Sequence, residues 1–114
     1  MKYVLNFRHP LRADQRVHLS TLLDQPFVEI CREAHFDAAR PDFDMQVTEM
    51  CLASAHDAGG GGNVIAIVPP GLGAAAYIVG RWFRQEAPQA RVVWFYREDS
   101  PDMPMARWII GGIG

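Results

Sequence analysis

The sequence has little of what marks a secreted, membrane-bound or metal-binding protein. Only two cysteines, Cys31 and Cys51, occur among 114 residues, and their spacing matches no metal-ligand motif, although it leaves a single disulfide open. No apolar run approaches the ~20 residues of a membrane-spanning helix. The apolar start, residues 1–5, is too short for a signal peptide. We therefore expect a cytoplasmic protein with no membrane partner, no metal and no cofactor.

The chain also lacks an excess of charge of either sign. Eleven basic and thirteen acidic residues give a formal net charge of −2, which disfavours binding to a long nucleic acid. Binding of a small anionic ligand needs only a local positive site, so this function remains an alternative. The length of 114 residues, 49% of them apolar, suits one domain spanning residues 1–114.

Segments with strand and helix patterns alternate along the chain. We expect strands at 3–7, 28–32, 64–68, 92–96 and 106–113, and helices at 12–23, 42–58 and 72–87. The run of four glycines at 59–62 is interpreted as a helix cap and flexible connector, and 97–103 as a polar loop. This order predicts an α/β fold, with a mostly parallel sheet that helices cover on both faces.

Right-handed crossovers predict that the first four strands lie in the order second, first, third, fourth. The strand 28–32 then lies near an edge, and the apolar strand 64–68 is central. The order reverses between the first and third strands, where open α/β sheets bind ligands at the carboxyl ends. The segments that should face each other there are 6–9 and 69–73.

The segment after the third strand, Pro69-Pro70-Gly71-Leu72-Gly73, predicts a tight turn into a helix. Glycines let a ligand approach the backbone, and the first N–H groups of a helix lack intrahelical partners, so such an end attracts phosphate. A turn that binds nothing is an equally open reading. The hypothesis makes Pro70, Gly71, Leu72, Gly73 and Ala74 ligand contacts.

The segment after the first strand adds polar groups. Arg8 offers a permanent cation with a donor fork suited to phosphate, and His9 can transfer a proton near neutral pH. Asn6 either contacts a ligand or fixes the turn, and Phe7, Arg8 and His9 are further expected ligand contacts. Surface or capping roles remain open for Arg8 and His9. The other histidines, His18, His35 and His56, show no metal spacing and are expected to be structural or solvated.

Two short motifs carry a family resemblance that spans nearly the whole chain in length and element order. The motifs Asn6-Phe7-Arg8-His9-Pro10-Leu11 and Pro69-Pro70-Gly71-Leu72 resemble a small CRISPR-associated family of type III loci that is grouped with ring nucleases. The resemblance implies a Rossmann-like fold related to the sensor (CARF-like) domains that bind cyclic oligoadenylates. It also implies a homodimer that holds one cyclic tetra-adenylate across its two-fold axis.

Within this resemblance, Asn6, His9, Gly71 and Leu72 fall on matching motif positions. Arg8 departs from the pattern, because a hydroxyl is expected there. A guanidinium would strengthen phosphate binding, but it puts any role of the hydroxyl in cleavage in doubt. The expected function is to lower the concentration of the messenger, either by sequestration or by slow metal-independent ring cleavage with Arg8 and His9 as catalytic residues. The alternative is a non-catalytic interaction protein that binds another phosphate-containing ligand or none.

A homodimer is also expected from apolar residues. The helix 72–87 carries them around most of its circumference, and Trp108, Ile109 and Ile110 follow near the end of the chain.

Overall fold

The computed structural model describes residues 1–37, 39–98 and 107–114. In these ranges, a five-stranded sheet has the order β2-β1-β3-β4-β5. Its strands are β1 (Tyr3–Asn6), β2 (Val28–Cys31), β3 (Val64–Val68), β4 (Arg91–Glu98) and β5 (Arg107–Ile113). The helices are α1 (Ala13–Leu23), α2 (Phe43–Asp57) and α3 (Gly73–Glu86), with a short 3-10 turn η1 (Gly61–Asn63) before β3.

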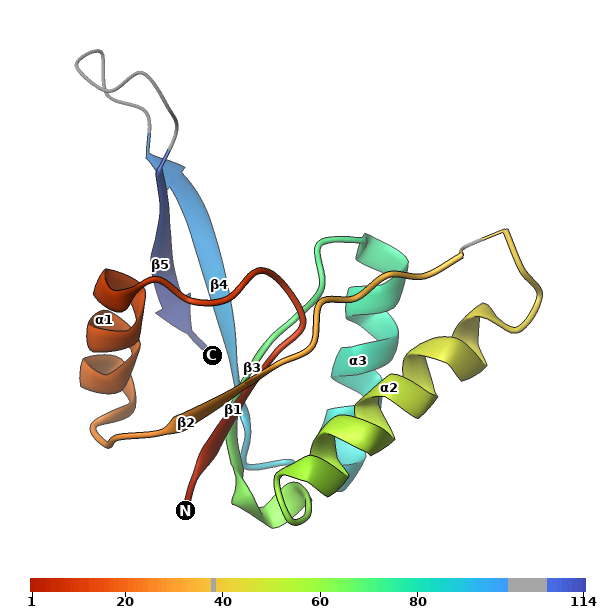
Figure 1. Ribbon diagram of the computed structural model, residues 1–114, viewed down its shortest axis with the longest axis horizontal. Helices are drawn as coiled ribbons and strands as arrows, with labels where there is room; N and C mark the ends of the chain where they lie inside the picture. The colour runs from red at the N-terminus through yellow and green to blue at the C-terminus, as the bar shows by residue number, and fades with distance from the viewer. Residues whose placement is uncertain (38, 99–106) are drawn as a thin grey trace.

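The strand directions confirm the predicted α/β class. Strand β1 pairs in parallel with β2 and β3, and β3 pairs in parallel with β4. Strand β5 runs antiparallel to β4 at the far edge. The observed order of the first four strands is the predicted one. Because β1 and β3 are parallel neighbours, their carboxyl ends lie side by side, as Figure 1 shows, and the strand order reverses between them.

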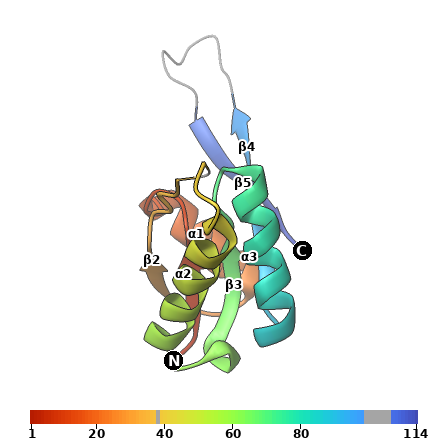
Figure 2. The ribbon, with the colours of Figure 1, turned by 90° about the vertical axis from the view of Figure 1, so that its right-hand side faces the viewer.

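The sheet separates two apolar cores. Helices α2 and α3 lie together on one side, whereas α1 lies on the other side near β5 (Figures 1 and 2). Alternate residues of a strand point to opposite faces, so Leu5 packs in the cluster of α2 and α3, and Val4 packs in the cluster of α1. Both side chains are fully buried. The arrangement is compatible with a Rossmann-like fold.

Helix α3 differs from its prediction, because it has one apolar face and not an apolar circumference. Its inner face buries Ala75, Ile78, Val79 and Phe83. The opposite face is exposed and carries Tyr77, Gly80, Arg81 and Arg84. The apolar face of α3 packs in the protein's own core. This helix therefore does not supply the exposed apolar surface from which a dimer was inferred.

Strand β4 is longer than predicted. Arg97 and Glu98 extend the strand by pairing with Trp108 and Arg107 of β5, where a polar loop was expected. The rest of that predicted loop, 99–103, lies outside the described residues, as does Ala106.

The four glycines after α2 form a helix cap and the start of a 3-10 turn, which is more regular structure than the predicted connector. Gly59 has a φ of 78°, and its N–H donates to His56 O while the N–H of Gly60 donates to Ala55 O. This pair of bonds is a Schellman cap, so the predicted helix stop is confirmed. Gly61 then starts the 3-10 turn η1 and packs against the end of α3, where an added Cβ would lie 2.4 Å from Glu86 O.

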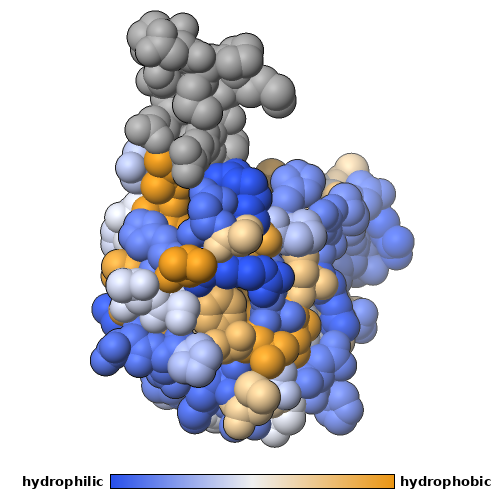
Figure 3. All heavy atoms as spheres, turned by 60° about the vertical axis from the view of Figure 1, so that its left-hand side comes forward, coloured by the Kyte–Doolittle hydropathy of each residue, from blue (hydrophilic) through white to orange (hydrophobic). Residues whose placement is uncertain are grey.

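No helix among the described residues is long and apolar enough to cross a membrane. The space-filling view in Figure 3 shows several separate hydrophobic areas on this side of the molecule, with hydrophilic residues between them.

We expect Gly61→Ala to destabilise the protein, because its Cβ would meet the backbone carbonyl of Glu86. Overpacking of this kind costs about 1–3 kcal/mol. Gly62→Ala is the matched control, because a Cβ there meets nothing within 4 Å. Urea denaturation of both variants measures the difference, and equal free energies of unfolding would contradict the close contact.

Candidate functional site

Three chain segments meet at the carboxyl edge of the sheet. A hollow of about 250 Å³ is lined by the segment after β1, the segment after β2 and the turn after β3, namely Phe7, Arg8, His9, Glu33, Ala34, His35 and Gly71. A neighbouring hollow of about 520 Å³ shares Ala34, His35 and Gly71 and extends along Phe36 and Asp37 to Pro70 and Leu72. The predicted crevice between 6–9 and 69–73 therefore exists, and a third segment, 33–37, forms part of its wall.

Asn6 holds the turn that follows β1. Its side chain is fully buried. The amide Nδ2 donates to His9 O at 2.8 Å and to Glu29 Oε2 at 2.7 Å, and Oδ1 accepts from the N–H of Arg8 at 2.9 Å. Both amide donors are used within the protein, so of the two open readings the structure favours the one in which Asn6 fixes the turn.

Glu29 links this turn to α1. Its side chain is only 3% exposed, although it stands on the edge strand β2. One carboxylate oxygen accepts from Asn6 Nδ2 and from the N–H of Leu11, and the other accepts from the guanidinium of Arg16. A buried carboxylate needs such donors to replace its lost hydration. The sequence reasoning missed Glu29, since an alternating Val-Glu-Ile pattern predicts only an outward-facing residue.

Arg8 lies at the rim of the crevice, half-buried. Its guanidinium carbon is 5.7 Å from the centre of the Phe95 ring, in cation–π geometry. On that side of the turn, Arg8, His9 and Phe95 help to line a further hollow of about 240 Å³. Phe7, by contrast, sends its side chain into the core, where the ring centre lies 6.1 Å from that of Phe83. Only the backbone of Phe7 is suited to a ligand contact.

The turn after β3 leads directly into α3 with an open helix end. Leu72 is the N-cap and supplies no side-chain cap. The first intrahelical bond runs from Ala76 N to Leu72 O, so the N–H groups of Gly73, Ala74 and Ala75 have no intrahelical partner. The end is accessible, because residues 71–74 are all exposed, whereas Pro70 is buried. Gly73 does not have a positive φ, and a Cβ there would meet nothing within 4 Å.

Three residues of the hollow were not predicted, and two of them, Glu33 and His35, have titratable side chains. His9 Nδ1 lies 3.1 Å from Glu33 Oε1, and His35 Nε2 lies 3.6 Å from Glu33 Oε2. His35 was expected to be structural or solvated, and it is indeed exposed, but it shares a carboxylate with the candidate catalytic His9. The available signal was its position: it follows β2, whose carboxyl end must reach the same edge of a parallel sheet.

The cysteines are both free. Burial raises the pKa of Cys51 to about 12, so this thiol stays protonated at neutral pH. The pKa of Cys31 is also raised, by burial first and then by the charges of Glu29 and Glu33. Among the described residues, no group of histidine, cysteine and acidic side chains is arranged to hold a metal ion.

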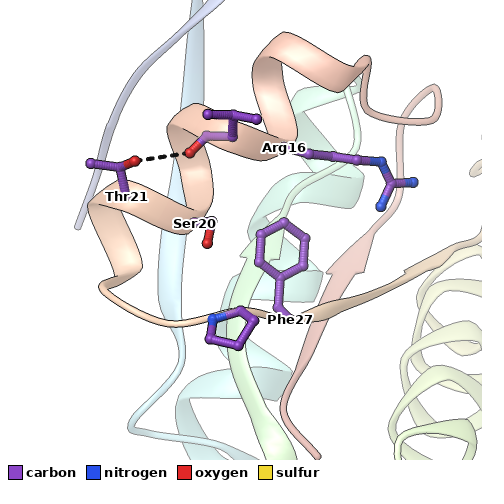
Figure 4. A pocket seen from close by; sticks show the side chains of 6 residues that line it. Arg16, Ser20, Thr21 and Phe27 are labelled. Carbon is purple, nitrogen blue, oxygen red and sulfur yellow. Dashed lines mark hydrogen bonds between the residues drawn. The ribbon is translucent and has the colours of Figure 1, made fainter.

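A separate hollow of about 360 Å³ lies between α1 and the segment that enters β2 (Figure 4). Its polar groups have partners inside the protein: Thr21 Oγ1 donates to Val17 O, Ser20 Oγ donates to Gln25 O, and Arg16 pairs with Glu29. The crevice at the carboxyl edge is the better candidate for a ligand site, because it lies where the strand order reverses and beside the uncapped start of α3.

We expect Asn6→Asp to destabilise the protein strongly. The substitution places a second oxygen against His9 O and against the Glu29 carboxylate, where Nδ2 now donates to both. Leaving buried polar groups without partners costs about 1–3 kcal/mol, and more beside a charge. Asn63→Asp is the control, because it removes one donor, to Ala58 O, at a half-buried position. Chemical denaturation that shows no larger loss for Asn6→Asp would refute this account of the turn.

Comparison with known proteins adds no family: no family model, no curated protein and no solved structure matches the chain.

Proposed function

We propose that the protein binds cyclic tetra-adenylate and lowers the concentration of this antiviral second messenger in the cytoplasm. It does so by sequestration or by slow, metal-independent ring cleavage. The observation that carries the proposal is that the Arg8 turn and Gly71 line one hollow, and that Gly71 stands two residues before the uncapped N-terminus of α3. The resemblance of the motifs at these two places to the ring-nuclease group supports the choice of ligand.

The chemistry of the crevice suits a ligand that carries phosphates. The guanidinium of Arg8 is a permanent cation. The free N–H groups at the start of α3 add hydrogen-bond donors and the positive end of the helix dipole. Gly71 and Gly73 present backbone without side chains, so a phosphate can approach closely. These features bind phosphodiesters whether or not the ring is then cleaved.

Cleavage without a metal requires the ribose 2′-OH to attack the adjacent phosphorus in line. A 2′,3′-cyclic phosphate forms, and the bond to the 5′-oxygen breaks. Arg8 and the helix N–H groups would stabilise the developing charge. His9 is oriented for proton transfer, because its Nδ1 faces Glu33 and its Nε2 is left for the substrate. Such a site has few acid–base groups, which is consistent with slow turnover.

We further propose that the protein is a homodimer, with the apolar surface on β4 and not on α3. Val92, Trp94 and Tyr96 alternate along β4 and therefore share one face. Their exposed fractions are 42%, 51% and 51%. The Trp94 indole lies against the backbone of β5, where a Cβ at Gly112 would be 2.5 Å from the ring. This half-exposed apolar face is suited to a second copy of the chain.

One experiment separates the competing functions. Excess protein is incubated with labelled cyclic tetra-adenylate, and both retention and product are followed over time. Product identifies a nuclease, and retention without product identifies a sequestering protein. If neither retention nor product is observed, the alternative function is favoured: an interaction protein with a different phosphate ligand or none.

Arg8→Ala is expected to weaken binding of cyclic tetra-adenylate by about tenfold to a hundredfold, since a hydrogen bond to a charged group contributes about 1.5–3 kcal/mol. Isothermal titration calorimetry measures the change. Arg84→Ala removes an exposed arginine at the other end of α3 and serves as the control. An unchanged dissociation constant for folded Arg8→Ala counts decisively against this site.

Gly73→Val should block the approach of a phosphate to the helix N-terminus while the melting temperature changes only modestly. The structure provides the reason, because Gly73 has no positive φ and open space beside it. Gly80→Val is the matched control, as Gly80 is an exposed glycine of the same helix with equally open space. If both variants bind cyclic tetra-adenylate as the unmodified protein does, the helix end is not the phosphate site.

Trp94→Arg should convert the dimer to a monomer, because it places a charge in the apolar face of β4. Tyr77→Arg alters an aromatic residue that is 70% exposed on α3 and should leave the dimer intact. Light scattering at micromolar concentration gives the mass of each form. A monomeric mass of the unmodified protein, with and without ligand, would refute the dimer, and dissociation by Tyr77→Arg alone would move the interface to α3.

A further inference from the structure

Glu33 lies between two histidines that come from different connections of the sheet. Its two carboxylate oxygens face different rings, Oε1 facing His9 Nδ1 at 3.1 Å and Oε2 facing His35 Nε2 at 3.6 Å. Both imidazoles are largely exposed, at 91% and 84% of the side chain, whereas the Glu33 side chain is 39% exposed. All three residues line the same hollow as Gly71.

This arrangement suits a phosphodiester. A phosphodiester presents two anionic oxygens on one centre, as a carboxylate does, and protonated imidazoles donate to either. We propose that His9 and His35 are phosphate-binding residues of the crevice and that the Glu33 carboxylate occupies the place of one phosphate until the ligand displaces it. The identity of the ligand in this inference rests on the proposed function. The inference adds His35 to the residues that bind the ligand, and it makes Glu33 a competitor of the ligand within the protein.

The charged groups around the hollow determine which residues favour and which oppose the binding of an anion. Arg8 on the turn after β1 favours an anion. Glu33 opposes it, as does Asp37, which lines the neighbouring hollow. Cys31 on β2 contributes no charge at neutral pH, because its pKa is raised, and its Sγ donates to Arg8 O at 3.2 Å. Gly71, on the third wall, adds no titratable group. The carboxylate nearest to both imidazoles is therefore the main local barrier to an anionic ligand.

The two imidazoles can be tested separately. An imidazole N–H can donate to an anionic oxygen of a phosphodiester, as it can to a carboxylate oxygen. His35→Ala removes one of the two rings that face Glu33 and should weaken the binding of cyclic tetra-adenylate at pH 6, as measured by isothermal titration calorimetry. Unchanged affinity of this variant would remove His35 from the site.

Glu33→Gln provides the decisive test, because the two accounts of Glu33 predict opposite signs. If Glu33 competes with the ligand, the variant binds cyclic tetra-adenylate at pH 6 more tightly, by about two- to fivefold, the size typical of an exposed charge pair. If Glu33 only orients His9, the variant binds more weakly. Asp24→Asn makes the same change in net charge at the exposed end of α1 and suits the left-handed backbone there, since Asp24 has a φ of 56°. This control variant should leave the affinity unchanged.

A second probe separates this inference from the proposed function. Inorganic phosphate is titrated at pH 6 while the imidazole resonances of His9 and His35 are followed by NMR. If cyclic tetra-adenylate fails to bind any form, the proposed function is lost. The inference still stands if phosphate shifts both resonances, and does so at lower concentration in Glu33→Gln than in Asp24→Asn. Equal or weaker binding of both probes by Glu33→Gln overturns it.

Discussion

The candidate site depends on one buried carboxylate, that of Glu29. It comes from the edge strand β2, yet it accepts hydrogen bonds from the turn after β1 and from α1. Moving a carboxylate out of water is costly, and its donors do little more than offset that cost. The main effect of the network is therefore to fix positions and not to raise the stability. It holds Asn6 in place, and Asn6 in turn holds the backbone of Arg8 and His9.

The crevice combines this rigid turn with groups of both charges. Arg8 and the start of α3 attract an anion, whereas Glu33 and Asp37 repel one. A purely basic crevice would attract any polyanion in the cell, including long nucleic acids. Mixed charges favour a ligand whose phosphates reach the Arg8 turn and the helix end together. Such mixed charges agree with the small cyclic ligand that we propose.

Local sequence patterns predicted the scaffold well, because they carry its main determinants. The bounds of β3 were predicted to the residue, since its apolar run ends at Pro69 and Pro70. The strand order followed from the handedness of the crossovers, which depends on chain chirality and not on detail. The general place of the crevice followed from that order.

The features that the sequence analysis did not predict share one cause: they depend on contacts between residues that are distant in sequence. The extra length of β4 comes from pairing with β5, and the inward position of Glu29 comes from donors on β1 and α1. His35 seemed solvated when taken alone, because only the folded sheet brings its segment beside His9. The glycine run was read by composition, although its members have different backbone and packing requirements. For α3, the sequence did not show that one face would lie outside the core.

The contact between Cys31 and the Arg8 carbonyl has a practical consequence. The two thiols of the chain differ sharply in access, as Cys51 is fully buried and Cys31 is exposed on the edge strand. Cys31 Sγ touches the backbone of the residue that carries the candidate phosphate contact. A single fluorescent or spin label can therefore be attached beside the crevice without engineering a new cysteine. Cys31 thus gives the native chain an attachment point for such a probe beside the proposed site.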